Sequence, residues 1–338
     1  MNIQEGISKV SSNNNLSQSE MSAIMSDILN GRSTDAQIGA FLIALSMKGE
    51  TVDEVLGAAH AMRNLSAKVI TDSPKLIDTC GTGGTGIRIF NVSTTSAFVA
   101  SACGARVAKH GNRTATRKSG SADLLEEAGV SLSLKPEEIA KCIEEVGIGF
   151  MFAPSHHSAM KHVIGPRKEI GQKSIFNILG PLTNPASAKR QIMGVYDKKW
   201  MLPIAHVLKE LGSEHLLIVY SDDGLDEISI AAPTSVVEMK KDTITEFQIC
   251  PEDFGFETSS LEGLEANSPE QSLQIANLAL RGEHKEASAM VAMAAGAALY
   301  ISDISDSLVS GVELAKDCIK EGGGVSKLNE LIDFSSKF

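Results

Sequence analysis

This 338-residue sequence lacks the features of disulfide-rich, zinc-binding, secreted and membrane-spanning proteins. Its five cysteines are dispersed along the chain, at Cys80, Cys103, Cys142, Cys250 and Cys318. No pair has metal-binding spacing, so reduced thiols are expected rather than a disulfide framework. Residues 1–18 contain no apolar signal region, and the most apolar run, 289–301, is too short to cross a bilayer. We therefore expect a cytoplasmic protein that does not contact a membrane.

A basic net charge and the familiar catalytic motifs are also missing. The net charge of −11 opposes binding to nucleic acid, so any phosphate site must be a local basic pocket. The chain has no Gly-x-Ser-x-Gly, His-Glu-x-x-His, Cys-x-x-Cys or Walker sequence, which argues against serine hydrolase, zinc protease, thiol redox and P-loop chemistry. The length and the ordinary apolar content of 43% indicate a globular protein of one large or two modest domains.

The most informative segment is the glycine-rich stretch from Asp78 to Gly86, which places four glycines within six residues after an apolar run. Backbone N–H groups in such a turn converge on an anion, so phosphate or pyrophosphate is the expected ligand. The spacing also satisfies the dinucleotide pattern Gly-x-Gly-x-x-Gly, but residues 101–109 offer no acid to hold a ribose. Asn91, Ser93 and Thr94, at the start of the next predicted helix, favour the anion interpretation.

The first 70 residues are predicted to be helical. They contain three capping-box patterns, Ser17-x-x-Glu20, Thr34-x-x-Gln37 and Thr51-x-x-Glu54. Prolines and glycines interrupt the helical periodicity between Gly165 and Pro185, and we expect this segment to return to the helical unit. The predicted small helical domain is therefore discontinuous and comprises residues 1–71 with 166–190.

From about residue 75, short apolar runs alternate with helical segments, which is typical of an α/β fold with a mostly parallel central sheet. The predicted strands are 76–78, 105–108, 149–152, 191–195 and 215–220. The large α/β domain would comprise residues 72–165 with 191–338. Ligands of such sheets bind at the carboxyl ends of the strands.

Polar clusters follow several of these predicted strand ends. Residues 109–113 combine two cations, an imidazole and an amide, and suit a phosphate clamp. Residues 222–227 place four carboxylates within six positions, between apolar flanks, which favours Mg²⁺ or a cationic partner. Arg167, between the predicted domains, matches a substrate carboxylate, with an ordinary salt bridge as an equal alternative.

Several segments together resemble the anthranilate phosphoribosyltransferases. They are Ala40–Leu45, Lys48–Thr51, Gly81–Gly86, Phe90–Thr94, Val107–Arg113, Lys118–Asp123, Phe176–Ala186 and Gly224–Ser229. The segments follow the order of that family along most of the chain. The resemblance implies a small helical domain, a large α/β domain, a cleft between them and a homodimer formed through the helical domains.

The resemblance also implies an activity in tryptophan biosynthesis. Phosphoribosyl pyrophosphate and anthranilate would give N-(5-phosphoribosyl)anthranilate and pyrophosphate, with a pair of Mg²⁺ ions at each active site. Lys109, His110 and Arg167 would be catalytic, and Ser93, Asp226 and Glu227 would bind the metal. The substrate-binding positions implied are Gly81, Gly83, Gly84, Thr85, Ile89, Asn91, Val92, Ser93, Thr94, Lys109, Asn112, Arg113, Arg117, Ser121, His157 and Arg167.

Departures from the family's usual pattern are concentrated at the donor site. Thr85 stands where the family usually has Asp, Arg88-Ile89 where it has Asn-Thr, and 115–117 where it has Val-Ser-Ser. One acid is lost and two arginines are gained, a local charge change of +3. We hypothesise that the donor phosphates receive more direct cationic contact and depend less on metal.

Two alternatives remain open at this point. A pyrimidine nucleoside phosphorylase shares the implied architecture, but its loop resembles Lys-x-Ser-Thr-Gly-Gly, whereas this chain has Asp78-Thr-Cys-Gly-Thr-Gly-Gly84. A non-catalytic relative would bind nucleic acid or another polyanion through the basic residues Arg88, Lys109, Arg113, Arg117 and Lys118. The net charge and the retained Asp226-Glu227 pair argue against that second alternative, so no nucleic acid partner is expected.

Overall fold

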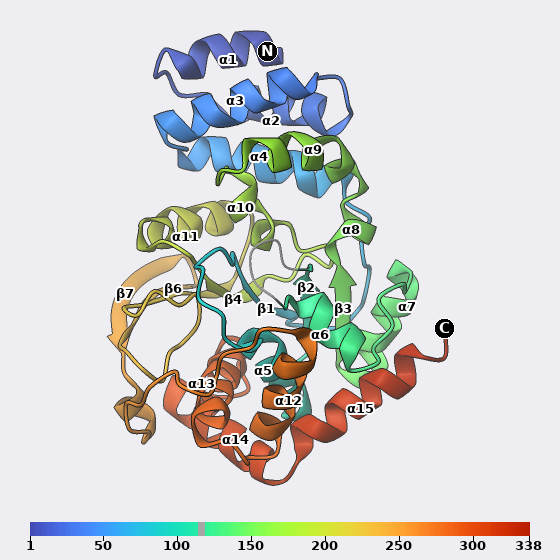
Figure 1. Ribbon diagram of the computed structural model, residues 1–338, viewed down its shortest axis with the longest axis vertical. Coiled ribbons are helices and arrows are strands. Elements are labelled where there is room, and N and C mark those ends of the chain that lie inside the picture. Colours follow the sequence, from blue (N-terminus) through green and yellow to red (C-terminus); the bar gives the residue numbers. More distant parts are fainter. Residues whose placement is uncertain (114–118) are drawn as a thin grey trace.

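The protein, seen in a computed structural model, is described over residues 1–113 and 119–338. A helical bundle is joined through a waist to a larger part built on a central sheet (Figure 1). The bundle begins with α1 (Ile3–Ser11), α2 (Gln18–Leu29), α3 (Asp35–Lys48) and α4 (Val52–Leu65). The three predicted capping boxes start α2, α3 and α4, and Asn2 with Glu5 forms a further one at α1.

Within the described residues, seven strands form one sheet in the order β3-β2-β1-β4-β5-β6-β7. The strands are β1 (Ile77–Gly81), β2 (Val107–Gly111), β3 (Ile148–Phe152), β4 (Arg190–Gly194), β5 (His215–Ser221), β6 (Thr234–Lys240) and β7 (Thr243–Ile249). Strands β1 to β5 run parallel, which confirms the predicted mostly parallel sheet. Strands β6 and β7 add an antiparallel edge through a two-residue turn at Lys241 and Asp242, both with positive φ.

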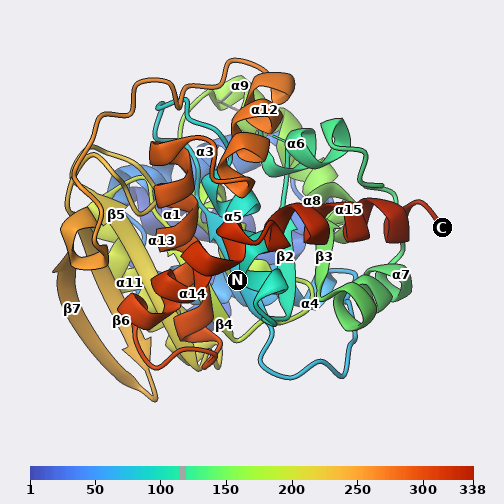
Figure 2. The same cartoon turned by 90° about the horizontal axis from the view of Figure 1, so that it is seen from below.

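Helices cover both faces of the sheet. Successive strand residues point to opposite sides, and apolar side chains on both sides are buried against helices. Leu217 and Val219 of β5 pack into one core, and Leu216 and Ile218 into the other. The first core includes α5 (Val92–Ala102), α6 (Ser121–Glu127), α7 (Pro136–Lys141), α12 (Pro269–Leu280), α13 (Lys285–Ile301), α14 (Leu308–Lys320) and α15 (Gly323–Ser335). Figure 2 shows α5, α13, α14 and α15 from below.

The second core joins the sheet to the helical bundle through α11 (Met201–Glu210), which contacts α4, β5 and β6. The predicted apolar helix at 289–301 is the buried part of α13. Across residues 1–113 and 119–338, none of the helices combines the length and apolarity that crossing a bilayer requires.

The chain returns to the bundle after β3 and the short helix α8 (Ala153–His156). Helix α9 (Lys161–Ile170) packs on α2 and α3, and α10 (Phe176–Leu179) contacts α4. The predicted loss of helical periodicity from Gly165 is wrong for the first part of the segment, since α9 continues through Gly165 and Pro166. A proline removes one backbone hydrogen bond, and the packing of α9 on the bundle offsets this. The domain boundaries themselves stay a prediction.

Candidate active site

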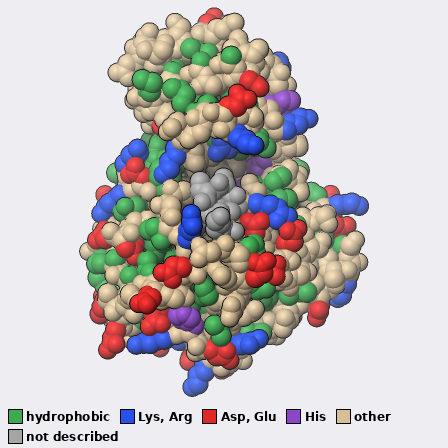
Figure 3. Space-filling view, viewed as in Figure 1, with side chains coloured by type: hydrophobic (Ala, Val, Ile, Leu, Met, Phe, Trp, Pro, Cys, Tyr) green, Lys and Arg blue, Asp and Glu red, His purple; other side chains and the backbone are tan. Residues whose placement is uncertain are grey.

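A cavity of about 340 Å³ lies where the carboxyl ends of β1 and β2 meet the start of α5 and the segment that carries α9 and α10. On the face shown in Figure 3, Lys and Arg side chains lie on both sides of the waist. Most of the predicted site residues line this cavity: Gly81, Gly83, Gly84, Asn91, Ser93, Lys109, His110, Asn112, Arg113, Ser121, Arg167 and Glu227. The parallel sheet brings them together because its strands end at one edge.

The other predicted residues that lie within the described part of the chain do not line the cavity. Ile89 is buried and pairs through its backbone with Glu265, while Val92 and Thr94 are buried in the first turn of α5. Thr85 stays within the glycine loop, where its hydroxyl accepts a hydrogen bond from the Ile87 N–H at 3.3 Å. His157 lies behind the lining residue His110, and Asp226 lies behind the lining residue Gly83. Arg117 lies outside the described residues.

The glycine loop is held from behind by Asp226. The Gly83 N–H donates to Asp226 Oδ2 at 2.9 Å. Gly83 and Gly84 have φ values of 61° and 80°, which glycine adopts at little cost. A Cβ on Gly194 of β4 would lie 1.7 Å from the Asp226 carbonyl oxygen. The backbone at Asp226 can therefore lie this close to β4 only if residue 194 has no side chain. The loop's position therefore depends on Gly194.

Glu227 brings a carboxylate to the cavity, and the Asp226 carboxylate lies directly behind the lining, on the Gly83 N–H. Glu227 Oε1 accepts a hydrogen bond from the Ser93 N–H at 3.3 Å, which ties the acidic turn to the start of α5. Among the described residues, no group of three or more His, Cys, Asp or Glu side chains is arranged so that it could hold a metal ion by itself. Mg²⁺ prefers a few protein oxygens supplemented by water and phosphate oxygens. The two carboxylates and the Ser93 hydroxyl therefore fit Mg²⁺.

Lys109 lies under the cavity floor with its ammonium almost fully buried. The ammonium donates to the carbonyl and hydroxyl oxygens of Thr79 on β1. Burial lowers the pKa of Lys109, and the neighbouring Asp78 carboxylate opposes that shift. Asp78 is itself buried and accepts hydrogen bonds from Asn184, Gln191 and the His110 N–H. This buried network fixes Lys109 beside Thr79, on the strand that leads into the glycine loop.

The rings of His110 and His157 lie against each other at a tilt of 55°, with their centroids 5.1 Å apart. Burial lowers the pKa of His110 well below its usual range, and the adjacent His157 and His156 lower it further. Burial likewise lowers the pKa of His157 to about 4. Both imidazoles are therefore neutral at physiological pH. His110 lines the cavity and His157 supports it from behind.

Arg167, near the end of α9, faces the cavity from the helical side. Its guanidinium lies 5.3 Å from the ring centroid of Phe176, which also lines the cavity. Within the described residues Arg167 forms no ion pair, and burial alone lowers its pKa. A partly buried guanidinium beside an aromatic ring provides both halves of a site for an aromatic carboxylate.

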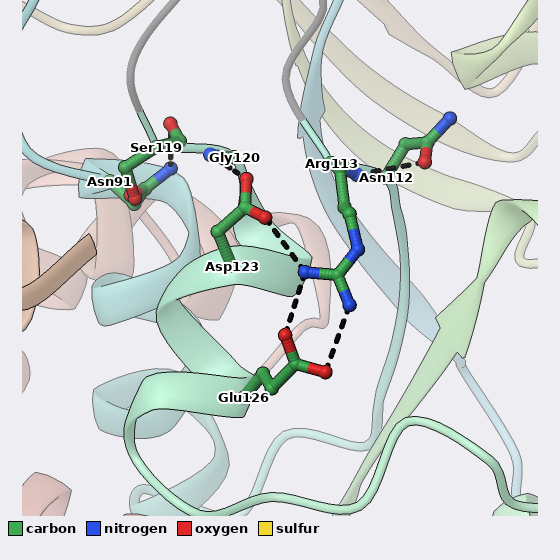
Figure 4. A network of polar contacts seen from close by, with 7 residues as sticks. All are labelled: Asn91, Asn112, Arg113, Ser119, Gly120, Asp123 and Glu126. Atoms are coloured by element: carbon green, nitrogen blue, oxygen red, sulfur yellow. Dashed lines mark hydrogen bonds and ion pairs between the residues drawn. The ribbon is translucent and has the colours of Figure 1, made fainter. Parts of the chain in front are cut away.

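Arg113 and Asn91 have protein partners at the edge of the cavity. The Arg113 guanidinium binds both Glu126 oxygens, at 2.7 and 2.8 Å, and Asp123 Oδ1 at 2.9 Å (Figure 4). These carboxylates raise the pKa of Arg113. Asn91 exchanges hydrogen bonds with Ser119, at 3.3 and 3.0 Å (Figure 4). Arg113 is thus directed toward α6, while Asn91 is locked at the first turn of α5.

Two family models match the chain. Residues 4–66 match the helical bundle domain of the glycosyl transferase family, and residues 73–325 match its α/β domain. The anthranilate phosphoribosyltransferases of Ectopseudomonas mendocina and Marinomonas sp. strain MWYL1 are each 53% identical, over 100% of this chain and 98% of their own length. The chain belongs to the anthranilate phosphoribosyltransferase family.

Solved structures of anthranilate phosphoribosyltransferases share the whole fold. The enzyme from Thermus thermophilus superposes with a TM-score of 0.93 at 37% identity, covering 98% of this chain and 99% of that one. The enzyme from Saccharomyces cerevisiae, in complex with PRPP and Mg, has a TM-score of 0.91 at 27% identity. It covers 99% of this chain and 98% of its own. The predicted family membership is confirmed.

The structure adds residues to this phosphoribosyltransferase site that sequence reasoning did not assign. Phe176, Asn177, Gly180 and Pro181 line the cavity. All four belong to the segment Phe176–Ala186 that carried the family resemblance, so their place in a characteristic block was the available signal. Gly194 had no such signal, because its role depends on a loop 32 residues later in the chain, at Asp226.

Proposed function

We propose that this chain transfers the phosphoribosyl group of phosphoribosyl pyrophosphate to the amino group of anthranilate. The observation that carries the proposal is the cavity itself, which combines a glycine loop, the buried Lys109 cation and an Arg167 guanidinium beside an aromatic ring. The loop and Lys109 suit a pyrophosphate, and Arg167 suits an aromatic carboxylate. One cavity therefore complements both the donor and the acceptor.

The donor end of the site would stabilise the leaving group. As the bond between the ribose C1 and the pyrophosphate oxygen breaks, negative charge grows on pyrophosphate. The glycine loop is held by Asp226 and Lys109 by Thr79, so both are fixed beside the position of this charge before the reaction begins. Bound through Asp226, Glu227 and Ser93, a pair of Mg²⁺ ions would supply further positive charge at the same oxygens.

The acceptor end would position the amine and receive its proton. Arg167 would bind the anthranilate carboxylate through two hydrogen bonds, with Asn112 beside it, and so direct the amino nitrogen toward C1. The nitrogen forms the new bond to C1 and then loses a proton. His110 is neutral and lines the cavity, so its imidazole is in the correct state to accept that proton.

We also propose that the donor phosphates depend less on metal here than in relatives with Asp at the position of Thr85. In this chain the Thr85 hydroxyl binds the Ile87 N–H, and Arg88 is exposed beside the loop. Measuring rate against free Mg²⁺ tests the idea in wild type, Arg88→Asn and a control, Arg281→Asn, at an exposed helix end. A greater Mg²⁺ requirement for Arg88→Asn alone supports it, and identical curves for all three contradict it.

The assembly and location of the enzyme extend the proposal. A homodimer formed through the helical part is supported by exposed apolar side chains there, Met47 at 84% and Ile164 at 59% exposure. Light scattering after gel filtration measures the oligomeric state, and a monomeric mass at micromolar concentration would contradict the dimer. The cysteines are all free, which suits a reducing compartment such as the cytoplasm.

Anthranilate fluorescence provides the direct test of the activity. The purified chain is incubated with anthranilate, phosphoribosyl pyrophosphate and MgCl₂, and loss of anthranilate is followed with time. Consumption that requires the donor and releases pyrophosphate supports the proposal. No consumption at high enzyme concentration, with the chain folded by circular dichroism, would refute it.

A further inference from the structure

Lys173 places a second cation beside the glycine loop. It belongs to the link between α9 and α10, on the helical side of the waist. Its Cε and Nζ atoms lie 3.7 and 3.9 Å from the position that a Cβ would occupy on Gly84. Gly84 lines the cavity. The Lys173 side chain therefore lies against Gly84 of the glycine loop.

A fixed aromatic ring holds the Lys173 ammonium at this position. The ammonium lies 3.8 Å from the centroid of the Tyr196 ring. The Tyr196 N–H donates to Thr82 Oγ1 at 2.9 Å, and its hydroxyl accepts from Trp200 Nε1 at 3.1 Å. Tyr196 is thus attached both to the glycine loop and to the helix that follows β4. The ring keeps the cation next to the loop without neutralising it.

The charge of Lys173 is available to a ligand. The residue is exposed, and within residues 1–113 and 119–338 it forms no ion pair. A contact with an aromatic face is weaker than a charge-assisted hydrogen bond to a phosphate oxygen. An anion bound to the loop amides would therefore attract the ammonium away from the Tyr196 ring at little cost.

We propose that Lys173 is a donor-binding residue, which clamps the pyrophosphate group onto the glycine loop from the helical side. The expected change in the donor KM rests on the proposed function. The expected change in affinity for pyrophosphate rests only on the binding of anions by the loop. Arg167 lies six positions earlier in the same return segment, so one segment carries an acceptor anchor and a donor clamp. The two residues should then separate in their effects on the two substrates.

The test compares Lys173→Met with Lys168→Met, which removes an exposed cation from the same segment. Inorganic pyrophosphate with MgCl₂ is titrated into each full-length variant by calorimetry, and both KM values are measured by the fluorescence assay. Loss of one charge-assisted contact predicts a Kd for pyrophosphate and a KM for the donor about tenfold higher in Lys173→Met. The KM for anthranilate should change by less than about twofold. A tenfold change would require the loss of a contact worth about 1.4 kcal/mol, and Lys173 is not proposed to contact anthranilate.

The control and the rescue variant decide the outcome. Lys168→Met should retain wild-type values, and Lys173→Arg should restore most of the donor affinity because it keeps the charge. Pyrophosphate affinity within twofold of wild type in Lys173→Met would overturn the inference, as would an equal loss in Lys168→Met. If the wild type binds pyrophosphate but consumes no anthranilate, the proposed function fails while the titration still decides the role of Lys173.

Discussion

Replacing Gly194 by alanine should displace the acidic turn of the active site without touching a substrate. The added Cβ would lie 1.7 Å from the Asp226 carbonyl oxygen and 2.4 Å from its carbonyl carbon. A Cβ essentially never comes closer than 3.0 Å to such an atom, so β4 and the Asp226 turn must separate by about 1.3 Å. Both contacting atoms are backbone, so a side-chain rotation cannot absorb the movement.

The expected cost has two parts. Overpacking of this size destabilises a fold by about 1–3 kcal/mol. A displacement of about 1 Å in a catalytic group lowers activity by about 100-fold. Since the Asp226 carboxylate holds the Gly83 N–H and Glu227 holds the Ser93 N–H, the movement should reach both the glycine loop and the carboxylates proposed to bind the metal.

The fluorescence assay measures kcat and both KM values for Gly194→Ala over a range of free Mg²⁺, and urea denaturation measures its free energy of unfolding. The control is Gly165→Ala in α9, where the added Cβ meets nothing within 4 Å. This control should retain full activity. Its free energy of unfolding should equal that of the wild type or exceed it by up to about 1 kcal/mol. A Gly194→Ala protein with wild-type kcat/KM and Mg²⁺ dependence would refute the reasoning.

Three further predictions concern the acceptor site, the bundle and the response to pH. Arg167→Ala should raise the KM for anthranilate at least about 10-fold through loss of a bidentate charge-assisted contact, with little change in the donor KM; equal effects on both substrates would contradict the assignment. Glu54→Leu should lower the free energy of unfolding by about 3–5 kcal/mol, because it leaves the buried Lys48 ammonium, now 2.9 Å from Glu54 Oε2, without its partner. The double variant with Lys48→Met should recover part of this loss in urea denaturation, and no recovery would argue against the ion pair as the cause. Burial lowers the pKa of His157 to about 4, so the unfolded chain binds a proton that the folded chain does not between about pH 6.5 and 4. Stability should therefore fall as the pH falls through this window, by up to about 3 kcal/mol from this residue, and the fall should be shallower in His157→Gln; parallel curves would exclude the effect.

Local patterns were sufficient to predict the helical N-terminus and the sheet. A capping box depends on residues three positions apart, so Ser17 with Glu20 already specifies where α2 begins. Apolar runs between helical segments likewise predicted β1 to β5. The antiparallel pair β6 and β7 was not predicted, and the sequence around Pro166 predicted an interrupted helix. In α9 the packing against the bundle outweighs the local preference of proline.

The site was predictable only in part, for a related physical reason. Recognisable blocks of sequence pointed to the glycine loop, Lys109, Arg167 and the Asp226-Glu227 pair. Those blocks do not show which groups approach each other in space. Arg113 is held by Asp123 and Glu126, and Lys173 stands over Gly84 on the Tyr196 ring. Each of these contacts is decided by the way distant elements pack.

The sequence by itself determined the family of this protein, its helical start, its parallel sheet and the chemical character of its ligands. These follow from short-range patterns, since capping, strand periodicity and a glycine-rich turn each involve neighbouring residues. The tertiary structure decided how the parts of the site meet. Gly194 lets the Asp226 turn pass β4, burial keeps His110 neutral, and the return of the chain to the bundle brings Arg167 to the cavity and Lys173 beside Gly84. Such close approaches and losses of solvent exist only once the chain has folded.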